Sequence, residues 1–136
     1  MQSQQLTPVS DLEREILKQL WDAGGASIRQ LTDEIYEDGS DAQYATIQKL
    51  LNRLERKGYV TRDRSQHKHI FKPLVTREAF LKDNLKHLAD NVCDGSWTPL
   101  ITTLIEKTRL SAAELQSLRE LVERKSRPAS KRKRKK

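Results

Sequence analysis

The chain has 136 residues, a length that suits one domain or one domain with an appendage. Of these residues 35% are hydrophobic and 33% are charged. No stretch approaches the roughly 20 apolar residues of a membrane span, and the first residues, MQSQQLTPVSD, do not have the pattern of a signal peptide. The single cysteine, Cys93, excludes an internal disulfide and a multi-cysteine metal site. We therefore expect a cytoplasmic protein with no membrane contact.

The formal net charge of +7 is distributed unevenly along the chain. Residues 1–42 carry 3 Lys/Arg against 9 Asp/Glu, and residues 43–75 carry 8 against 2. Residues 125–136 carry 8 Lys/Arg and no acidic residue. An acidic block followed by a basic block predicts a folded module with one positively charged face, which is typical of nucleic-acid-binding domains.

Three helices and a hairpin are predicted in the first half of the chain. Capping boxes at Ser10 and Ser27 begin the first two helices, which end at Gly24 and at Asp38-Gly39. A third helix is predicted over about 43–57. The sequence period then changes from that of a helix to that of a strand. It predicts strands over 59–63 and 69–72, joined by the polar loop 64–68. This order, with basic residues at the hairpin tip, is that of a winged helix.

Three more helices are predicted after residue 75. The first begins at Thr76 and ends at Gly95, the second is capped by Thr98, and the third begins at a capping box on Ser111. Their apolar stripes need a partner surface, which a second subunit would supply. We therefore predict a mainly α protein with a small β-hairpin wing. It comprises a winged-helix domain (1–75), a helical dimerisation region (76–125) and a disordered basic tail (126–136).

The third helix carries the residues best suited to read DNA. In helix-turn-helix proteins the N-terminal part of this helix enters the major groove, where Gln reads adenine, Thr meets thymine and Lys or Arg reaches guanine or phosphate. The hairpin tip would lie along the DNA backbone or in the minor groove, where its positive charge displaces counterions. The predicted DNA-binding residues are Gln43, Tyr44, Ala45, Thr46, Lys49 and Arg53 on the helix, and Arg62, Arg64, His67 and Lys68 on the wing (residues 62–68). The alternative is an ordinary amphipathic helix with a solvated polar face.

The stretch AQYATIQKLLNRLERKGYVTRD, with SDLEREILKQLW before it and FKPLVTRE after it, resembles the penicillinase-repressor family of bacterial winged-helix regulators. The resemblance covers about residues 7–125 and includes GSWTPLITTLIEKTRLSAAELQSLRELVE, which is similar to the family's dimerisation region. It implies a homodimeric repressor of a palindromic operator in double-stranded DNA, often with a TACA/TGTA core. The implied dimer-interface residues are Trp97, Leu100, Ile101, Leu104, Leu115, Leu118, Leu121 and Val122.

The chain departs from the family pattern at three places. Gln43-Tyr44-Ala45 replaces the Ser-Pro-Lys run that many members have, so the base preference is open. Thr103-Leu104 stands where β-lactam-responsive members have a cleavable Asn-Phe bond, so induction by a sensor or protease antirepressor is left open. The cysteine-rich end of the copper-responsive members is replaced by a run of Lys and Arg.

No residue pattern predicts an enzyme, a metal site or a cofactor. His67 and His69 could share one face of a strand, but no four-ligand set emerges. There is no glycine-rich phosphate loop or nucleophile elbow. Two rival functions remain at this point: a winged helix that docks another protein, and a nonspecific nucleic-acid-binding protein that depends on the basic tail. The tail could also be only a solubilising charge run.

Overall fold

The structure, a computed structural model, describes residues 6–37, 39–65 and 67–127. The chain divides into two compact units, residues 1–87 and residues 88–136. The division falls inside helix α4 (Arg77–Val92), whereas the sequence placed the change of region after residue 75. From residue 128 onward the predicted tail lies outside the described residues. None of the described helices is both long and apolar enough to cross a membrane.

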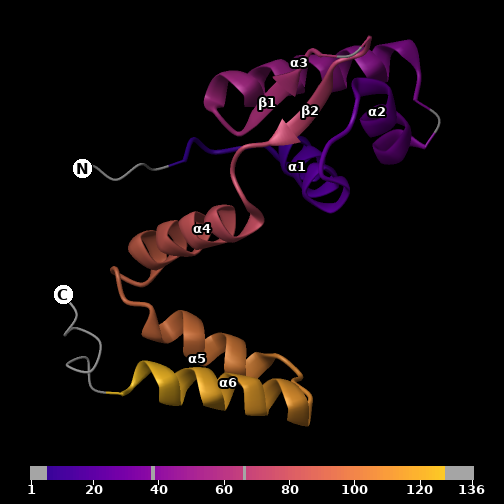
Figure 1. Cartoon of the computed structure of the whole chain (residues 1–136). Coiled ribbons are helices and arrows are strands. Elements are labelled where there is room, and N and C mark those ends of the chain that lie inside the picture. Colours follow the sequence, from indigo (N-terminus) through magenta and orange to yellow (C-terminus); the bar gives the residue numbers. More distant parts are fainter. Residues whose placement is uncertain (1–5, 38, 66, 128–136) are drawn as a thin grey trace, which may run out of the picture. The chain divides into compact units, whose positions relative to one another are not determined.

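Three helices form most of the N-terminal unit: α1 (Asp11–Ala23), α2 (Ile28–Tyr36) and α3 (Asp41–Lys57) (Figure 1). The predicted capping boxes on Ser10 and Ser27 begin the first two helices. Helix α3 begins earlier than predicted, because Ser40 caps it with a third box that sequence reasoning missed. Gly58 ends α3 with φ of 86°, a left-handed conformation that favours glycine.

The strands β1 (Val60–Asp63) and β2 (Ile70–Pro73) pair in antiparallel register, with Arg62 opposite Phe71. Phe71 also exchanges two backbone hydrogen bonds with Ala26, the residue before the Ser27 cap (3.0 and 2.8 Å). This isolated bridge fixes the hairpin to the connection between α1 and α2. Three helices followed by an antiparallel hairpin confirm the predicted winged-helix architecture.

The core of the N-terminal unit lies between the three helices and the hairpin. Phe80 on α4 packs on this core, with its ring 5.4 Å from that of Trp21 and 6.1 Å from that of Tyr59. The indole of Trp21 donates to the carbonyl of Val75 (2.8 Å). The apolar side chains that are essentially removed from solvent are Ile16, Leu17, Leu20, Leu31, Ile47, Leu51, Leu54, Tyr59, Val60 and Phe71. Such burial is the main favourable term in folding.

One ion pair lies at the edge of this core. The carboxylate of Glu13 is 1% exposed and lies 3.0 Å from Nζ of Lys57, which also donates to the carbonyl of Pro8 (2.9 Å). Burial works to raise the pKa of Glu13. The Ser10 backbone N–H and Lys57 outweigh it and lower the pKa below its ordinary value. The pair therefore joins α1, the end of α3 and the segment before α1.

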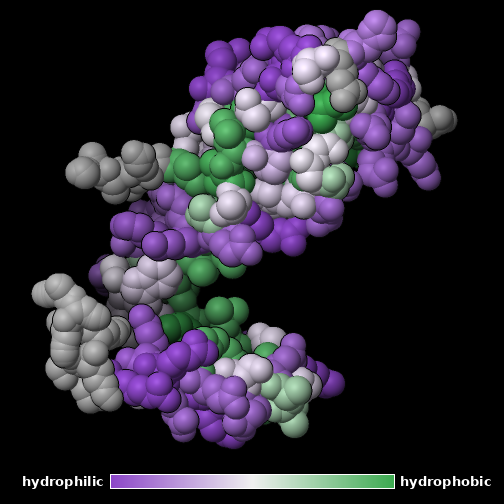
Figure 2. All heavy atoms as spheres, in the orientation of Figure 1, coloured by the Kyte–Doolittle hydropathy of each residue, from purple (hydrophilic) through white to green (hydrophobic). Residues whose placement is uncertain are grey.

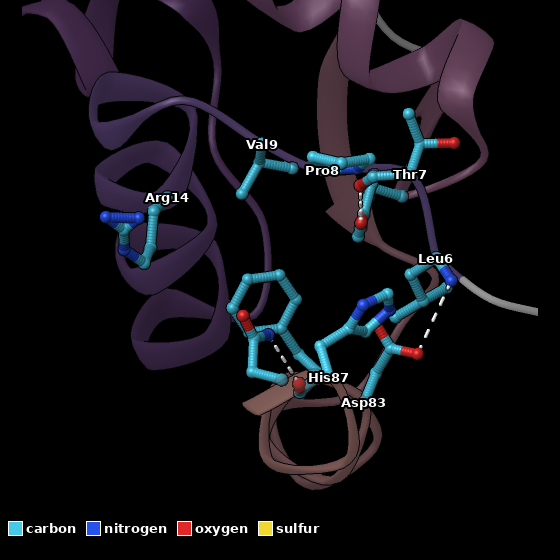
Figure 3. Close-up of a pocket in the computed structure, with 10 residues that line it drawn as sticks. Leu6, Thr7, Pro8, Val9, Arg14, Asp83 and His87 are labelled. Atoms are coloured by element: carbon cyan, nitrogen blue, oxygen red, sulfur yellow. Dashed lines mark hydrogen bonds and ion pairs between the residues drawn. The ribbon is translucent and has the colours of Figure 1, made fainter. Parts of the chain in front are cut away.

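The segment before α1 is also held by Tyr59 and α4 (Figure 3). The Tyr59 hydroxyl donates to the carbonyl of Thr7, and the N–H of Leu6 lies 3.5 Å from Oδ1 of Asp83. Burial, together with the charges of Asp83 and Glu13, raises the pKa of Tyr59 to about 12, so the hydroxyl keeps its proton at neutral pH. A hollow of about 240 Å³ is lined by Leu6, Thr7, Tyr59, Asp83 and His87, among others.

The C-terminal unit holds the end of α4 and the helices α5 (Thr98–Lys107) and α6 (Ala112–Lys125). The Ser111 capping box forms as predicted. The predicted cap on Thr98 is wrong: Thr98 is already helical, and Trp97 holds the cap position without a side-chain bond. Neither α5 nor α6 contains a buried residue. Figure 2 shows apolar side chains gathered along one side of this unit.

Candidate nucleic-acid interface

The two faces of α3 differ sharply in exposure. Its inner face buries Ile47, Leu50, Leu51 and Leu54 in the core. Its outer face exposes Ala45, Thr46, Gln48 and Lys49 to solvent. The Thr46 hydroxyl donates to the carbonyl of Ala42 (3.1 Å), one turn back along the helix. The helix therefore presents a small residue, a threonine and a lysine together within its first turns.

Gln43 takes part in the start of α3 and is half-buried. Its side-chain oxygen accepts the N–H of Ser40 (2.9 Å), and its own N–H donates to the Ser40 hydroxyl (3.2 Å). A bidentate contact with adenine needs both the oxygen and the nitrogen of the amide. The capping box occupies the oxygen, so the predicted adenine contact would require the cap to open. The spacing Ser40-x-x-Gln43 is the sequence pattern of a capping box and could have predicted this use of Gln43.

Tyr44 lies beside Gln43 and is also half-buried. Cζ of Arg29, on α2, lies 4.9 Å from the centre of its ring. The distance falls within the range of a cation–π interaction. The first turn of α3 is therefore in contact with the helix before it.

The tip of the wing carries three exposed basic side chains: Arg64, His67 and Lys68. Ser65 shapes the turn, since its N–H and hydroxyl both donate to Oδ1 of Asp63 (2.9 and 2.7 Å). The hydrogen bond from the Ser65 hydroxyl is the main cause of a lowered pKa at Asp63, which the Ser65 N–H and Lys72 lower further. Asp63 is therefore ionised at neutral pH. Its carboxylate contacts Ser65 and Lys72 within the hairpin.

Arg62 differs from the other predicted wing contacts because its guanidinium is engaged inside the domain. Nη2 donates to Oδ1 of Asn52 and to Oε1 of Glu55, both at 2.8 Å, and Nη1 lies 3.2 Å from Nδ1 of His69. Cζ lies 4.7 Å from the centre of the Phe71 ring. Arg62 thus braces the hairpin against α3. Sequence reasoning missed this role, since it assigned Arg62 to the DNA and gave Glu55 no part.

A shallow hollow of about 280 Å³ lies between α3, the wing and the start of α2. Tyr44 and Gln48 of α3 line it together with His67 and Lys68 of the wing. Arg29 lies at its α2 side. Of the predicted residues, Tyr44 of the helix and His67 and Lys68 of the wing therefore line one hollow. Arg53 is half-buried on the flank of α3, outside the hollow.

The remaining predicted residues lie on α5, on α6 and at Trp97. Their large apolar members are between 37% exposed, at Leu118, and 65% exposed, at Val122, while Leu100 is half-buried. The exposed members of the predicted dimer interface are Trp97, Ile101, Leu104, Leu115, Leu118, Leu121 and Val122.

Among the described residues, no group of three or more His, Cys, Asp and Glu side chains is placed to hold a metal ion.

Comparison with known proteins adds a family match. The family described as penicillinase repressor matches residues 9–124. The methicillin resistance regulatory protein MecI of Staphylococcus aureus strain N315 is 26% identical over 117 residues, which cover 86% of this chain and 94% of MecI. MecI of Staphylococcus epidermidis gives the same values. An uncharacterized 16.5 kDa protein of Latilactobacillus sakei is 23% identical over 114 residues, which cover 84% of this chain and 77% of that protein.

Proposed function

The chain belongs to the penicillinase repressor family, and from that premise we propose that it represses transcription as a homodimer bound to a palindromic operator. The first turns of α3 enter the major groove, and the wing lies against the DNA backbone. The family is one of regulatory repressors, and no catalytic step enters this proposal.

The observation that carries the proposal is the hollow shared by α3 and the wing. A duplex that follows this surface meets Tyr44 and Gln48 from the helix and His67 and Lys68 from the wing. The bracing of Arg62 against Asn52 and Glu55 holds the two elements in register before DNA arrives. Preorganisation of this kind lowers the ordering cost of binding.

We assign the predicted residues to two kinds of contact. Tyr44, Ala45, Thr46 and Lys49 face bases or the phosphates beside them, because they lie on the first turns of α3. Phosphates are contacted by Arg53, Arg64, His67 and Lys68. Gln43 contributes a base contact only if its cap opens, and Arg62 is left out because its charge is already paired.

The homodimer forms through α5 and α6. Helix α5 carries exposed isoleucines and a leucine, α6 carries exposed leucines and a valine, and neither helix buries any of them within the described chain. Exposed apolar surface of this extent marks an interaction site. A two-fold pairing of these faces would present two winged helices related by symmetry, and a palindrome has the matching symmetry.

The test begins with selection of bound duplexes from a random pool by the full-length protein. Dissociation constants are then measured for the selected duplex and a scrambled one over a range of salt concentrations. Replacement of Thr46 by alanine should reduce the preference for the selected duplex by about 1–3 kcal/mol. Arg64→Ala should weaken binding to both duplexes and reduce the salt slope by about one unit.

Lys18→Ala is the matched control, because Lys18 is an exposed cation on α1 and is not among the predicted DNA-binding residues. It should change neither the preference nor the slope. Equal, weak affinity of the wild type for both duplexes would contradict the proposal. It would favour a protein-docking winged helix or nonspecific binding by the tail.

A further inference from the structure

Arg29 touches three parts of the helix-turn-helix with one side chain. Nη1 lies 3.0 Å from Oδ1 of Asp33 on its own helix and donates to the carbonyl of Gly39 in the turn (3.2 Å). Its guanidinium carbon lies 4.9 Å from the centre of the Tyr44 ring on α3. The side chain therefore connects α2, the turn and the first turn of α3.

Gly39, whose carbonyl accepts the Arg29 hydrogen bond, lies close against α2. At Gly39 a Cβ atom would lie 2.3 Å from Cγ2 of Thr32, so only glycine fits without a shift. Glu37 precedes it with φ of 67°, a conformation that most side chains avoid. Ser40 then caps α3. The contact of Gly39 with Thr32 sets the turn against α2, and the hydrogen bond from Arg29 holds the carbonyl of the same residue.

We propose that Arg29 is a positioning residue for DNA recognition, which holds the Tyr44 ring and the first turn of α3 in the arrangement that enters the groove. This inference rests on the proposed function. Nη1 of Arg29 donates to both Asp33 and the Gly39 carbonyl, and these two bonds hold the guanidinium beside the Tyr44 ring. Arg29 therefore acts through Tyr44. It restricts the rotamers of the ring before DNA arrives, which lowers the ordering cost of binding.

The experiment is a double-mutant cycle with Arg29→Ala, Tyr44→Ala and the combined variant. Binding is measured on a duplex selected from a random pool and on its scrambled counterpart, over a range of salt concentrations. Arg29→Ala should reduce the preference for the selected duplex about three- to tenfold and leave the salt slope unchanged. In the Tyr44→Ala background it should have no further effect, because the two residues act as one unit.

Two outcomes would show a different role for Arg29. Equal weakening on both duplexes, with a salt slope smaller by about one unit, would mean a direct phosphate contact. Additive effects of the two substitutions would mean that Arg29 does not act through Tyr44. Either result overturns the inference, as does an unchanged preference in Arg29→Ala or in Tyr44→Ala.

Two further variants separate positioning from folding. Arg29→Lys keeps a cation near the ring but loses the planar guanidinium that lies over the Tyr44 ring while its Nη1 donates to Asp33 and Gly39, so it should restore part of the preference. Arg14→Ala removes a similar exposed pair, with Asp11 at 2.6 Å, on a helix away from the turn. It should leave the preference intact. A wild type that does not prefer the selected duplex would overturn the proposed function. A wild type that prefers it, with an equally large preference in Arg29→Ala, would overturn only this inference.

Discussion

The two units of the chain differ in how far their apolar side chains are buried. In the N-terminal unit, Ile16, Leu17, Ile47, Leu51 and Leu54 are fully buried. In α5 and α6, side chains of the same kind remain largely exposed. The first unit therefore has its own core, and the second has an amphipathic surface that a partner would complete. Stability of the first should depend on its own side chains, and stability of the second on protein concentration.

The largest difference is expected from two leucine substitutions. Leu51→Ala, at a fully buried site, should lower the free energy of unfolding by about 3–4 kcal/mol. Leu121→Ala, at a site 48% exposed, should leave unfolding of the N-terminal unit unchanged. The chain has two tryptophans, one in each unit, so urea titration of Trp21 fluorescence in a Trp97→Phe background reports on the first unit alone. Equal effects of both substitutions would remove the distinction between the units.

The buried ion pair offers the next largest effect. Lys57→Met removes the ammonium from Glu13, whose side chain is 1% exposed, and should cost about 3 kcal/mol at neutral pH. Lys18→Met, at an exposed and loosely paired lysine, is the control and should cost little.

The same pair predicts a pH dependence with a definite sign. The pKa of Glu13 is lowered on folding, so its contribution is complete above the ordinary value of 4.5 and is lost as the pH falls through the folded value. Lys57→Met removes a cause of the lowering, so the cost of this substitution should shrink as the pH falls below 4.5. Urea unfolding at pH 7 and at pH 4 measures this difference, and a cost that grows on acidification would contradict the assignment.

Local sequence signals predicted most of the N-terminal unit because caps and apolar spacing act over a few residues. Ser10 and Ser27 begin their helices as expected, and the strands lie within one residue of their predicted ends. The contacts of Arg62 and Arg29 were beyond this reasoning. Arg62 meets Asn52 and Glu55 only after the hairpin folds back on α3, and Arg29 meets Tyr44 only after the turn closes.

The proposed dimer face on α5 and α6 can be tested by placing a charge on it. Leu118→Glu introduces a carboxylate at the centre of α6 and should raise the dimer dissociation constant about a hundredfold, roughly 2.7 kcal/mol. Leu74→Glu is the matched control, since Leu74 is an exposed leucine of the N-terminal unit. Analytical ultracentrifugation over a range of concentrations measures both. A Leu118→Glu protein that dimerises like the wild type would place the interface elsewhere.

The smallest effect comes from two capping boxes of the same geometry, one in each unit. Ser40 accepts the N–H of Gln43 at 3.2 Å, and Ser111 accepts the N–H of Glu114 at 3.1 Å. Loss of either hydroxyl should cost its helix about 1 kcal/mol.

Ser40→Ala should lower the unfolding midpoint of the N-terminal unit at every protein concentration, because α3 forms part of a closed core. The cost of Ser111→Ala should appear as weaker dimerisation, because in the proposed dimer α6 is stabilised mainly by the partner helix. Trp21 fluorescence and sedimentation on both variants give the two readouts, and a concentration-dependent effect of Ser40→Ala would show that the first unit also depends on the partner.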